Sequence, residues 1–185
     1  MSKTLLQIMN EVVNVRNFED QIIPKKVLEE MFQAFILGPS SVSTQARELL
    51  VVDKTNTRHQ IIDATLNPYF TKDSYGAQKW LLQAPFVAIV LIENRRAIAR
   101  VGEIGERIAI QEAESAIQNF RLIAQSHGVC TTCLREFDPK KLKENLKLPW
   151  YIEPSTIITA GYCNDEIFSP PRLSISEVVS KEDWK

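Results

Sequence analysis

The N-terminal part of the chain carries apolar residues at the spacing of two amphipathic helices. One face of the first helix is formed by Leu5, Ile8, Met9, Val12 and Val13. Residues 16–24 break this pattern, and Pro24 suits the first turn of a second helix. We expect Gly38 to end that helix in the left-handed conformation that favours glycine. The apolar face of the second helix is formed by Val27, Leu28, Met31, Phe32, Phe35 and Ile36.

Short apolar runs predict the strands. Residues 86–93, FVAIVLIE, form a continuous apolar run typical of a strand buried on both faces. Residues 48–53, ELLVVD, predict a short buried strand, and residues 155–162, STIITAGY, predict a third clear one. Residues 129–134, VCTTCL, form a further short segment that follows the longest helix.

The remaining helices are placed by periodicity and by their end signals. Residues 57–66 and 74–83 each predict a small helix, and the Ala-rich stretch 105–128 predicts the longest one, which ends at Gly128. Residues 138–146 begin with an Asp N-cap followed by proline at the first helical position. The tail, residues 169–184, is expected to be extended and polar. Helices and strands mix without a regular βαβ alternation, so the pattern predicts an α+β fold.

Composition and charge narrow the class of protein. The 185 residues, 44% hydrophobic and 24% charged, predict one globular domain over residues 1–185. The net charge of −1 gives no reason to expect a nucleic acid or a membrane as a partner, since both require concentrated positive charge. The amphipathic N-terminus is a poor signal peptide, and the longest uncharged apolar run has nine residues, too few to span a bilayer as a helix. We therefore expect a cytoplasmic protein.

The sequence gives little reason to expect a phosphate-binding loop, a metal site or a set of disulfides. No glycine-rich phosphate loop follows a strand, and His59 and His127 lack the spacing of metal ligands. Cys130 and Cys133 would point to opposite faces of a strand, which excludes a disulfide between them. A zinc site needs four ligands, and only Cys163 remains, so we expect no metal. Three cysteines in a chain of this length do not predict a disulfide framework.

The segment after the second helix is the most unusual in the chain. Following Gly38 and Pro39, four of the next five residues are Ser or Thr, and Gln45 follows before the next apolar run. Small hydroxyl groups and an amide allow a backbone to approach a planar polar ligand and hydrogen-bond it. The alternative interpretation is a serine-rich connector after a capped helix.

Six segments occur in an order that resembles the nitroreductase-like family of FMN enzymes. In chain order they are VRNFED, GPSSVSTQAREL, AIQNFRLIAQSHG, FDPKKLKENLKLP, ITAGY and PPRLSISEVV. The resemblance covers essentially the whole chain. It implies a nitroreductase-like fold with a central mixed or antiparallel sheet flanked by helices. It also implies a homodimer with interlocked termini, in which both subunits contribute to two FMN sites at the interface.

The first functional segment matches the family only in part. The family begins with a basic pair, a serine, any residue and a basic residue, where this chain has Val12, Val13, Asn14, Val15 and Arg16. By resemblance, Arg16 reaches the pyrimidine edge of the flavin, where a cation stabilises negative charge on the reduced ring. Asn14 remains able to hydrogen-bond the phosphate, which Val12 and Val13 cannot do.

The serine-rich loop matches the family more closely. By resemblance, Pro39, Ser40 and Ser41 contact the flavin from across the dimer interface. Ser43 stands where asparagine is usual, and Gln45 matches the family. Ala46 and Arg47 replace a Pro-Trp pair.

Three further cofactor-binding candidates lie late in the chain. Arg172 matches the arginine that holds the phosphate in the family. Arg135 and Glu136 stand where a backbone N–H is offered to flavin N5, and their bulk is expected to reshape the substrate face. As an alternative, Arg135 replaces a lost phosphate contact or binds a substrate anion.

These matches predict an enzyme that binds FMN more weakly than its relatives. One missing charged hydrogen bond removes about 1.5–3 kcal/mol, or roughly 10- to 100-fold in affinity. The predicted reaction is NAD(P)H-driven ping-pong reduction of a nitroaromatic, quinone or similar electron-poor acceptor, with no catalytic side chain because the flavin carries the chemistry. The alternative is a catalytically weak dimer that binds flavin or another planar ligand and has a binding or regulatory role.

Overall fold

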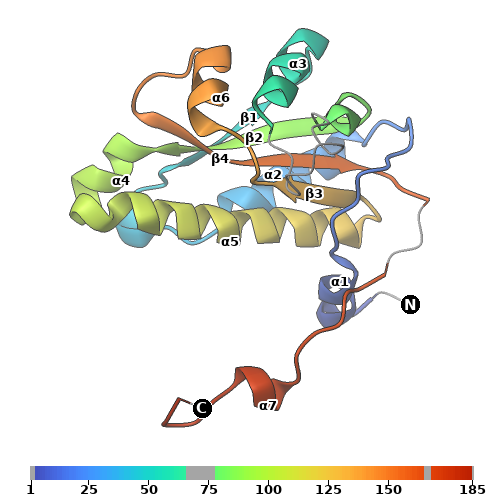
Figure 1. The fold of residues 1–185 in the computed structure, drawn as a ribbon. Coiled ribbons are helices and arrows are strands. Elements are labelled where there is room, and N and C mark those ends of the chain that lie inside the picture. The colour runs from blue at the N-terminus through green and yellow to red at the C-terminus, as the bar shows by residue number, and fades with distance from the viewer. Residues whose placement is uncertain (1–2, 66–77, 165–167, 185) are drawn as a thin grey trace, which may run out of the picture.

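The computed structural model describes residues 3–65, 78–164 and 168–184. Its centre is a four-stranded sheet, formed by β1 (Arg47–Val51), β2 (Phe86–Glu93), β3 (Cys130–Leu134) and β4 (Ile152–Gly161). The strand order is β1-β2-β4-β3 and every neighbouring pair is antiparallel. The α+β architecture predicted from the sequence is thus confirmed (Figure 1).

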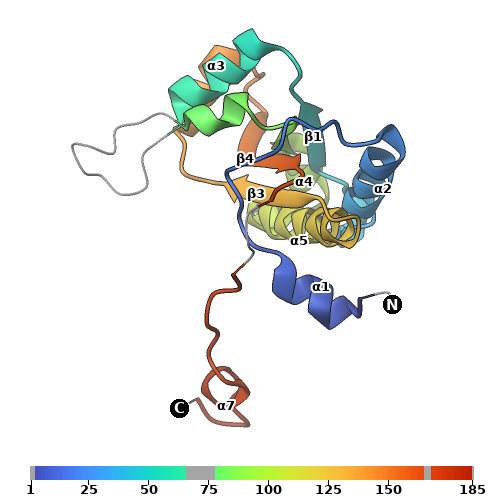
Figure 2. The same cartoon turned by 90° about the vertical axis from the view of Figure 1, so that its right-hand side faces the viewer.

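Helices cover both faces of this sheet. The elements α2 (Lys25–Ile36) and α5 (Gly105–Ser126) lie on one face, and α3 (Thr55–Ala64) and α6 (Pro139–Leu146) lie on the other (Figures 1 and 2). The strand β2 is buried along its whole length, as its continuous apolar run predicts. Its alternate residues enter the two cores, with Ala88 and Val90 on the α5 side and Val87 and Ile89 on the α3 side.

The strand β1 is more exposed than its sequence predicts. Leu50 and Val51 are 37% and 40% exposed, so the expectation of a buried strand over residues 48–53 is wrong for these two positions. The reason is topological, because β1 lies at the edge of the sheet and an apolar run does not distinguish an edge strand from a central one.

Gly38 has a different role from the one expected. Its φ is not positive, so the prediction of a left-handed helix end is wrong; in the described residues only Gly102 and Gly128 are glycines of that kind. A Cβ at Gly38 would lie 2.5 Å from the Cβ of Ala116 on α5. Gly38 therefore allows α2 and α5 to approach closely, while Gly128, with φ +71°, ends α5 as predicted.

Some shorter elements were missed or fall partly outside the described residues. The helix α4 (Asn94–Val101) was not predicted; the buried Glu93 side chain caps it by accepting from the Arg95 N–H at 3.2 Å. Of the helix expected over 74–83, the described part is a 3₁₀ turn, η3 (Lys79–Leu82). The other short turns are η1 (Ser41–Ser43) and η4 (Gly102–Ile104).

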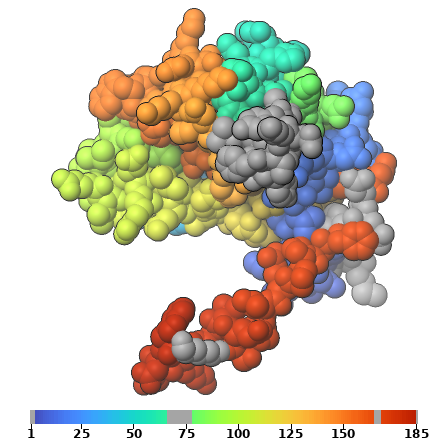
Figure 3. Space-filling model, viewed as in Figure 1, coloured from blue at the N-terminus to red at the C-terminus, as the bar shows by residue number. Residues whose placement is uncertain are grey.

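The two terminal segments lie outside the sheet and its covering helices, with α1 beside the end of α5 and the tail extending away. The helix α1 (Leu5–Glu11) has no buried residue, and the tail, which contains the short helix α7 (Ile175–Val178), projects beyond it (Figures 1 and 3). The Ser169 hydroxyl donates to Asn10 Oδ1 at 3.1 Å and so links the tail to α1. The tail was expected to be extended and polar; it contains a helical turn and several exposed apolar residues.

Candidate functional site

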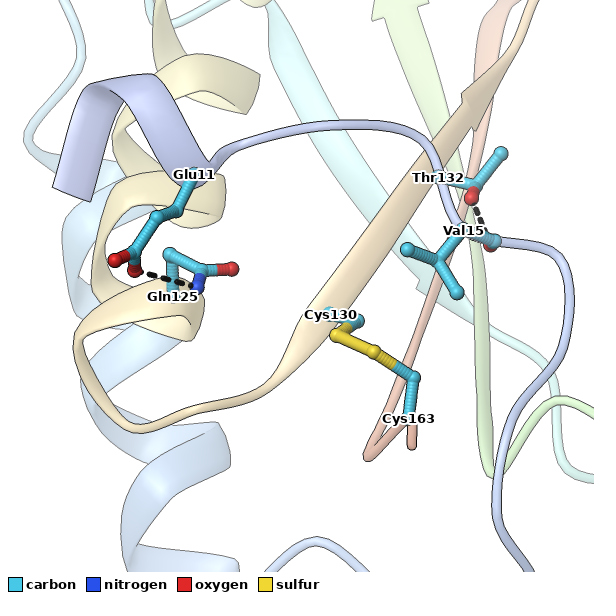
Figure 4. The surroundings of a disulfide bond; sticks show 6 residues. All are labelled: Glu11, Val15, Gln125, Cys130, Thr132 and Cys163. Carbon is cyan, nitrogen blue, oxygen red and sulfur yellow. Dashed lines mark hydrogen bonds between the residues drawn. A yellow bond between two sulfur atoms is a disulfide. The ribbon is translucent and has the colours of Figure 1, made fainter. Parts of the chain in front are cut away.

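Residues 14–16 run beside β3, the edge strand opposite β1. Asn14 forms a parallel bridge with Thr131, and the Val15 N–H donates to the Thr131 carbonyl at 3.3 Å. The Thr132 hydroxyl donates to the Val15 carbonyl, as Figure 4 shows. Val15 is buried, while its neighbours Asn14 and Arg16 are exposed. The sheet edge therefore fixes the backbone here and leaves both candidate side chains accessible to a ligand.

An arginine that the sequence reasoning missed reaches the same place from α5. The Arg121 Nη2 donates to Asn14 Oδ1 at 3.0 Å, and its Nε donates to the Thr131 hydroxyl at 3.0 Å. Asn14 Oδ1 also accepts from the Cys133 N–H at 3.4 Å. The only sign of Arg121 in the sequence is a single cation within the apolar stretch FRLIA, near the end of the longest helix. Periodicity alone does not specify what that part of the helix contacts.

Asn14 and Arg172 meet at one cavity, although they lie near opposite ends of the chain. The cavity has a volume of about 450 Å³ and is lined by Val12, Val13, Asn14, Arg121, Phe168, Pro170 and Arg172. Two arginines and an asparagine are among the lining residues, and the lining includes no carboxylate among the described residues. This donor set fits a phosphate group, which requires cations and N–H donors.

A disulfide lies next to this segment and corrects the expectation drawn from the cysteine count. Cys130, at the start of β3, is bonded to Cys163, just beyond β4, with Cα atoms 6.3 Å apart (Figure 4). The sheet register places Cys130 opposite Gly161, two residues before Cys163, and spacing along the sequence does not reveal that register. Cys133 is free and buried, and burial raises the pKa of its thiol.

The helix α1 is held against α5 beside the disulfide. Gln125 Nε2 donates to Glu11 Oε2 at 3.1 Å, as Figure 4 shows, and Lys3 Nζ donates to the same oxygen at 2.6 Å. Residues 12–16 are thus anchored at one end by α5 and at the other by β3.

The serine-rich loop is built from an uncommon backbone conformation. Val42, Ser43 and Gln45 have φ values of +51°, +54° and +45°, a region that residues other than glycine seldom occupy. The Gln45 N–H donates to Ser40 Oγ at 2.7 Å, and Gln45 Nε2 lies 3.4 Å from Ser43 Oγ. The polar residues expected to contact the cofactor therefore also hydrogen-bond to one another within the loop.

Two charged residues fix this loop to the body. The Ser41 N–H donates to the buried Glu112 carboxylate on α5. Arg47, which replaces the family's tryptophan, donates to the carbonyls of Ile36, Gly38 and Pro39 at 3.0, 2.6 and 2.6 Å. Burial lowers the pKa of Arg47, although the nearby Glu112 charge opposes that shift.

Arg135 and Glu136 form a separate group at the end of β3. Arg135 is ion-paired with Glu114 on α5, and the Thr156 hydroxyl donates to the same carboxyl at 2.8 Å. Burial raises the pKa of Glu114, but the hydrogen bonds from Arg135 and Thr156 bring it below its ordinary value. The Arg135 charge is therefore largely neutralised within the chain, and Arg135 does not line the cavity of Asn14 and Arg172.

The loop and the cavity are separated along α5. The loop contacts this helix at Glu112 and the cavity contacts it at Arg121. Nine residues of helix correspond to about 14 Å along its axis. Within one chain, Asn14 and Arg172 thus share a cavity, whereas Pro39, Ser40, Ser41, Ser43 and Gln45 lie some distance from it.

The fold and this arrangement define an α+β domain with a cavity at a sheet edge that is lined by two arginines and an asparagine. The sequence profile described as the nitroreductase family matches residues 14–162, and the chain belongs to that family. Val12, Val13 and Arg172 lie outside the matched segment.

Similarity to individual relatives extends over most of the chain. It is 22% identical to "FMN reductase (NAD(P)H)" of Bacillus subtilis, covering 95% of this chain and 75% of that one. It is 23% identical to "NADH dehydrogenase" of Thermus thermophilus, covering 90% of each. Among solved structures, the NADPH:FMN oxidoreductase from Vibrio harveyi, complexed with NAD⁺, superposes with a TM-score of 0.82 at 17% identity, covering 98% of this chain and 78% of that one.

Two features of the described residues bear on the kind of site. No helix within residues 3–65, 78–164 and 168–184 has the length and apolar character needed to cross a bilayer. Across those same ranges, His, Cys, Asp and Glu side chains do not gather in groups of three or more that would hold a metal ion.

Proposed function

We propose that this protein is an FMN-dependent oxidoreductase that takes electrons from NADH or NADPH and reduces a small electron-poor acceptor, such as a nitroaromatic or a quinone. The observation that carries the proposal is the cavity shared by Asn14 and Arg172, the two residues to which the family pattern assigns the FMN phosphate. Membership of the nitroreductase family and similarity to relatives named for FMN, NADH and NADPH support it.

The residues around this cavity fit the remaining parts of FMN. Arg16 is exposed, and its guanidinium has no hydrogen bond or ion pair in the described part of the chain, so it is available to the pyrimidine edge of the ring. The Arg135 N–H donates to the Glu136 carboxylate at 3.2 Å, which leaves the Glu136 N–H as the donor for flavin N5. The hydride chemistry would be supplied by the bound FMN, while the chain binds, orients and electrostatically stabilises it.

We further propose that the site is completed in a homodimer. A single chain leaves large apolar side chains of α1 and the tail exposed, among them Leu6 at 78%, Ile175 at 82% and Trp184 at 94%. Exposed apolar surface of this extent favours a protein interface. A second copy would cover these side chains and bring its own Pro39–Gln45 loop to the cavity, which the loop of the same chain does not reach.

The alternative, a catalytically weak dimer that binds flavin, is favoured by one observation. Val12 and Val13 line the cavity, in the place of the family's basic pair, and offer no side-chain donor to a phosphate. This alternative predicts flavin binding without turnover of a hydride donor.

The experiment begins with the absorbance spectrum of the purified protein before and after incubation with FMN and desalting. We expect retained flavin bands, oxidation of NADH or NADPH by the holoprotein with a quinone as acceptor, and a dimer by light scattering. Retained FMN without donor oxidation would support the binding dimer. A colourless protein that retains no added FMN would overturn both hypotheses, and a monomer would contradict the shared site.

A further inference from the structure

We propose that Arg121, on α5, is a phosphate-binding residue that replaces the cation lost at Val12 and Val13 and gives this site its preference for FMN over riboflavin. The inference rests on the proposed function, because it concerns the same flavin site. It goes beyond the family pattern, in which the phosphate cations come from the N-terminal motif and the late arginine.

The first argument is the position of Arg121. It lines the cavity together with Val12, Val13 and Arg172, so an arginine borders the same cavity as the two valines that stand in the place of the family's basic pair. It reaches this space from the middle of the chain. Arg121 therefore supplies the cavity with a cation that Val12 and Val13 do not.

The second argument is the geometry of the guanidinium. Its Nε donates to Thr131 and one Nη2 hydrogen donates to Asn14, both at 3.0 Å. An arginine carries five N–H donors, so these two bonds leave three for a ligand. Because β3 and the Asn14 bridge hold both acceptors, the fork is oriented before a ligand arrives. Such an oriented fork matches the oxygens of a phosphate.

The third argument is the balance of charge around Arg121. No carboxylate lines the cavity among the described residues. Glu11 is engaged by Lys3 and Gln125. Glu114, which feels the Arg121 charge, is ion-paired with Arg135. Among the residues that the structure describes, no carboxylate pairs directly with Arg121, so its positive charge is available to an anion.

This arrangement makes a specific prediction about ligand choice. FMN and riboflavin share the ring and the ribityl chain and differ in the phosphate. A charged hydrogen bond to the phosphate contributes roughly 10- to 100-fold in affinity. Arg121→Gln should weaken FMN binding by about that factor and leave riboflavin binding unchanged within about twofold.

A purely structural role for Arg121 would give a different result. Arg121 also positions Asn14 and β3, so a variant that only disturbs residues 12–16 would move Arg16 as well. Both flavins would then lose affinity in the same proportion. The ratio of the two dissociation constants separates the two roles, and Arg121→Lys, which keeps the charge, should restore part of the FMN preference.

The experiment measures dissociation constants for FMN and riboflavin by flavin fluorescence, at one fixed salt concentration, for the wild type, Arg121→Gln and Arg121→Lys. The matched control is Arg107→Gln, which removes an exposed arginine from the same helix. Thermal unfolding of each apoprotein shows whether the variant is folded. We expect the wild type and Arg107→Gln to prefer FMN and Arg121→Gln to lose that preference.

Each contrary outcome has its own meaning. If the wild type binds neither flavin, the proposed function fails and the inference fails with it. If the wild type prefers FMN and Arg121→Gln keeps that preference, the inference is overturned while the proposed function stands. Equal losses for both flavins, or a wild type that binds them equally, likewise overturn the assignment of Arg121 to the phosphate.

Discussion

The backbone N–H of Ser41 donates to the Glu112 carboxylate, which is buried on α5 and lies 71 residues further along the chain. This contact fixes the serine-rich loop to the long helix. Glu112→Ala leaves the Ser41 donor without its partner and should destabilise the fold by about 1–3 kcal/mol in urea unfolding. The exposed Glu103→Ala serves as the control and should change stability little. Equal stabilities for the two variants would mean that the contact contributes nothing.

Substitution of Val42 by glycine should increase stability, in contrast to Glu112→Ala. It is a β-branched residue at φ +51° whose side chain is 61% exposed, so glycine relieves backbone strain and loses little packing. Allowing for the greater chain entropy of glycine, Val42→Gly should stabilise the protein by about 0.5–1 kcal/mol. Leu37→Gly is the matched control, because Leu37 is 71% exposed at an ordinary φ of −72°, and it should destabilise. If Val42→Gly destabilises the protein, the Val42 backbone is not strained.

Loss of the disulfide should be measurable in the absence of any ligand. Cys130 and Cys163 close a loop with a sequence separation of 33, so Cys163→Ser should lower the free energy of unfolding by about 3–4 kcal/mol. Adding a reductant to the wild type should produce a comparable loss, and the variant itself should not respond to the reductant. A wild type whose stability is the same with and without reductant would show that the bond does not form.

Glu114 should contribute to a loss of stability at low pH. Burial raises its pKa, but the hydrogen bonds from Arg135 and Thr156 outweigh burial and bring the pKa below the ordinary 4.5. The unfolded chain then binds the proton more tightly, so this contribution is present above about pH 4.5 and is lost as the pH falls through the lower folded value. Urea unfolding between about pH 3 and pH 7 should show a shallower loss for Glu114→Gln than for the wild type. If the free energies of unfolding of the two proteins fall in parallel with pH, Glu114 is not the source of the acid dependence.

Arg172 should be needed for full FMN occupancy. It lines the cavity with Asn14 and sits on an exposed part of the tail, where its removal leaves the core intact. Arg172→Ala should weaken FMN binding by roughly 10- to 100-fold, because one charged hydrogen bond is lost. The flavin-to-protein absorbance ratio after desalting measures this. Occupancy equal to that of the wild type would remove Arg172 from the phosphate site.

Periodicity and end signals predicted most of the fold. The continuous apolar run FVAIVLIE identified β2, and the Asp138-Pro139 pair identified the start of α6. The errors arose where a property depends on a neighbour in space. Exposure of Leu50 depends on β1 being an edge strand, and the role of Gly38 depends on the approach of Ala116.

In the candidate site, too, some residues could be predicted from the sequence and others depend on a neighbour in space. Asn14 and Arg172 could be named from a family pattern because their order in the chain is retained. Arg121 could not, because only the packing of α5 against β3 brings it to Asn14. Likewise, the pairing of Cys130 with Cys163 follows from the register of β3 and β4, and a count of cysteines carries no information about register.

The cavity of Asn14, Arg121 and Arg172 is lined from both ends of the chain and from its middle. The sheet needs β4, which ends at Gly161, whereas the cavity also needs Phe168, Pro170 and Arg172. Removal of the residues after Cys163 would therefore leave every strand of the sheet and both disulfide cysteines in the chain, but it would remove three of the seven residues that line the cavity.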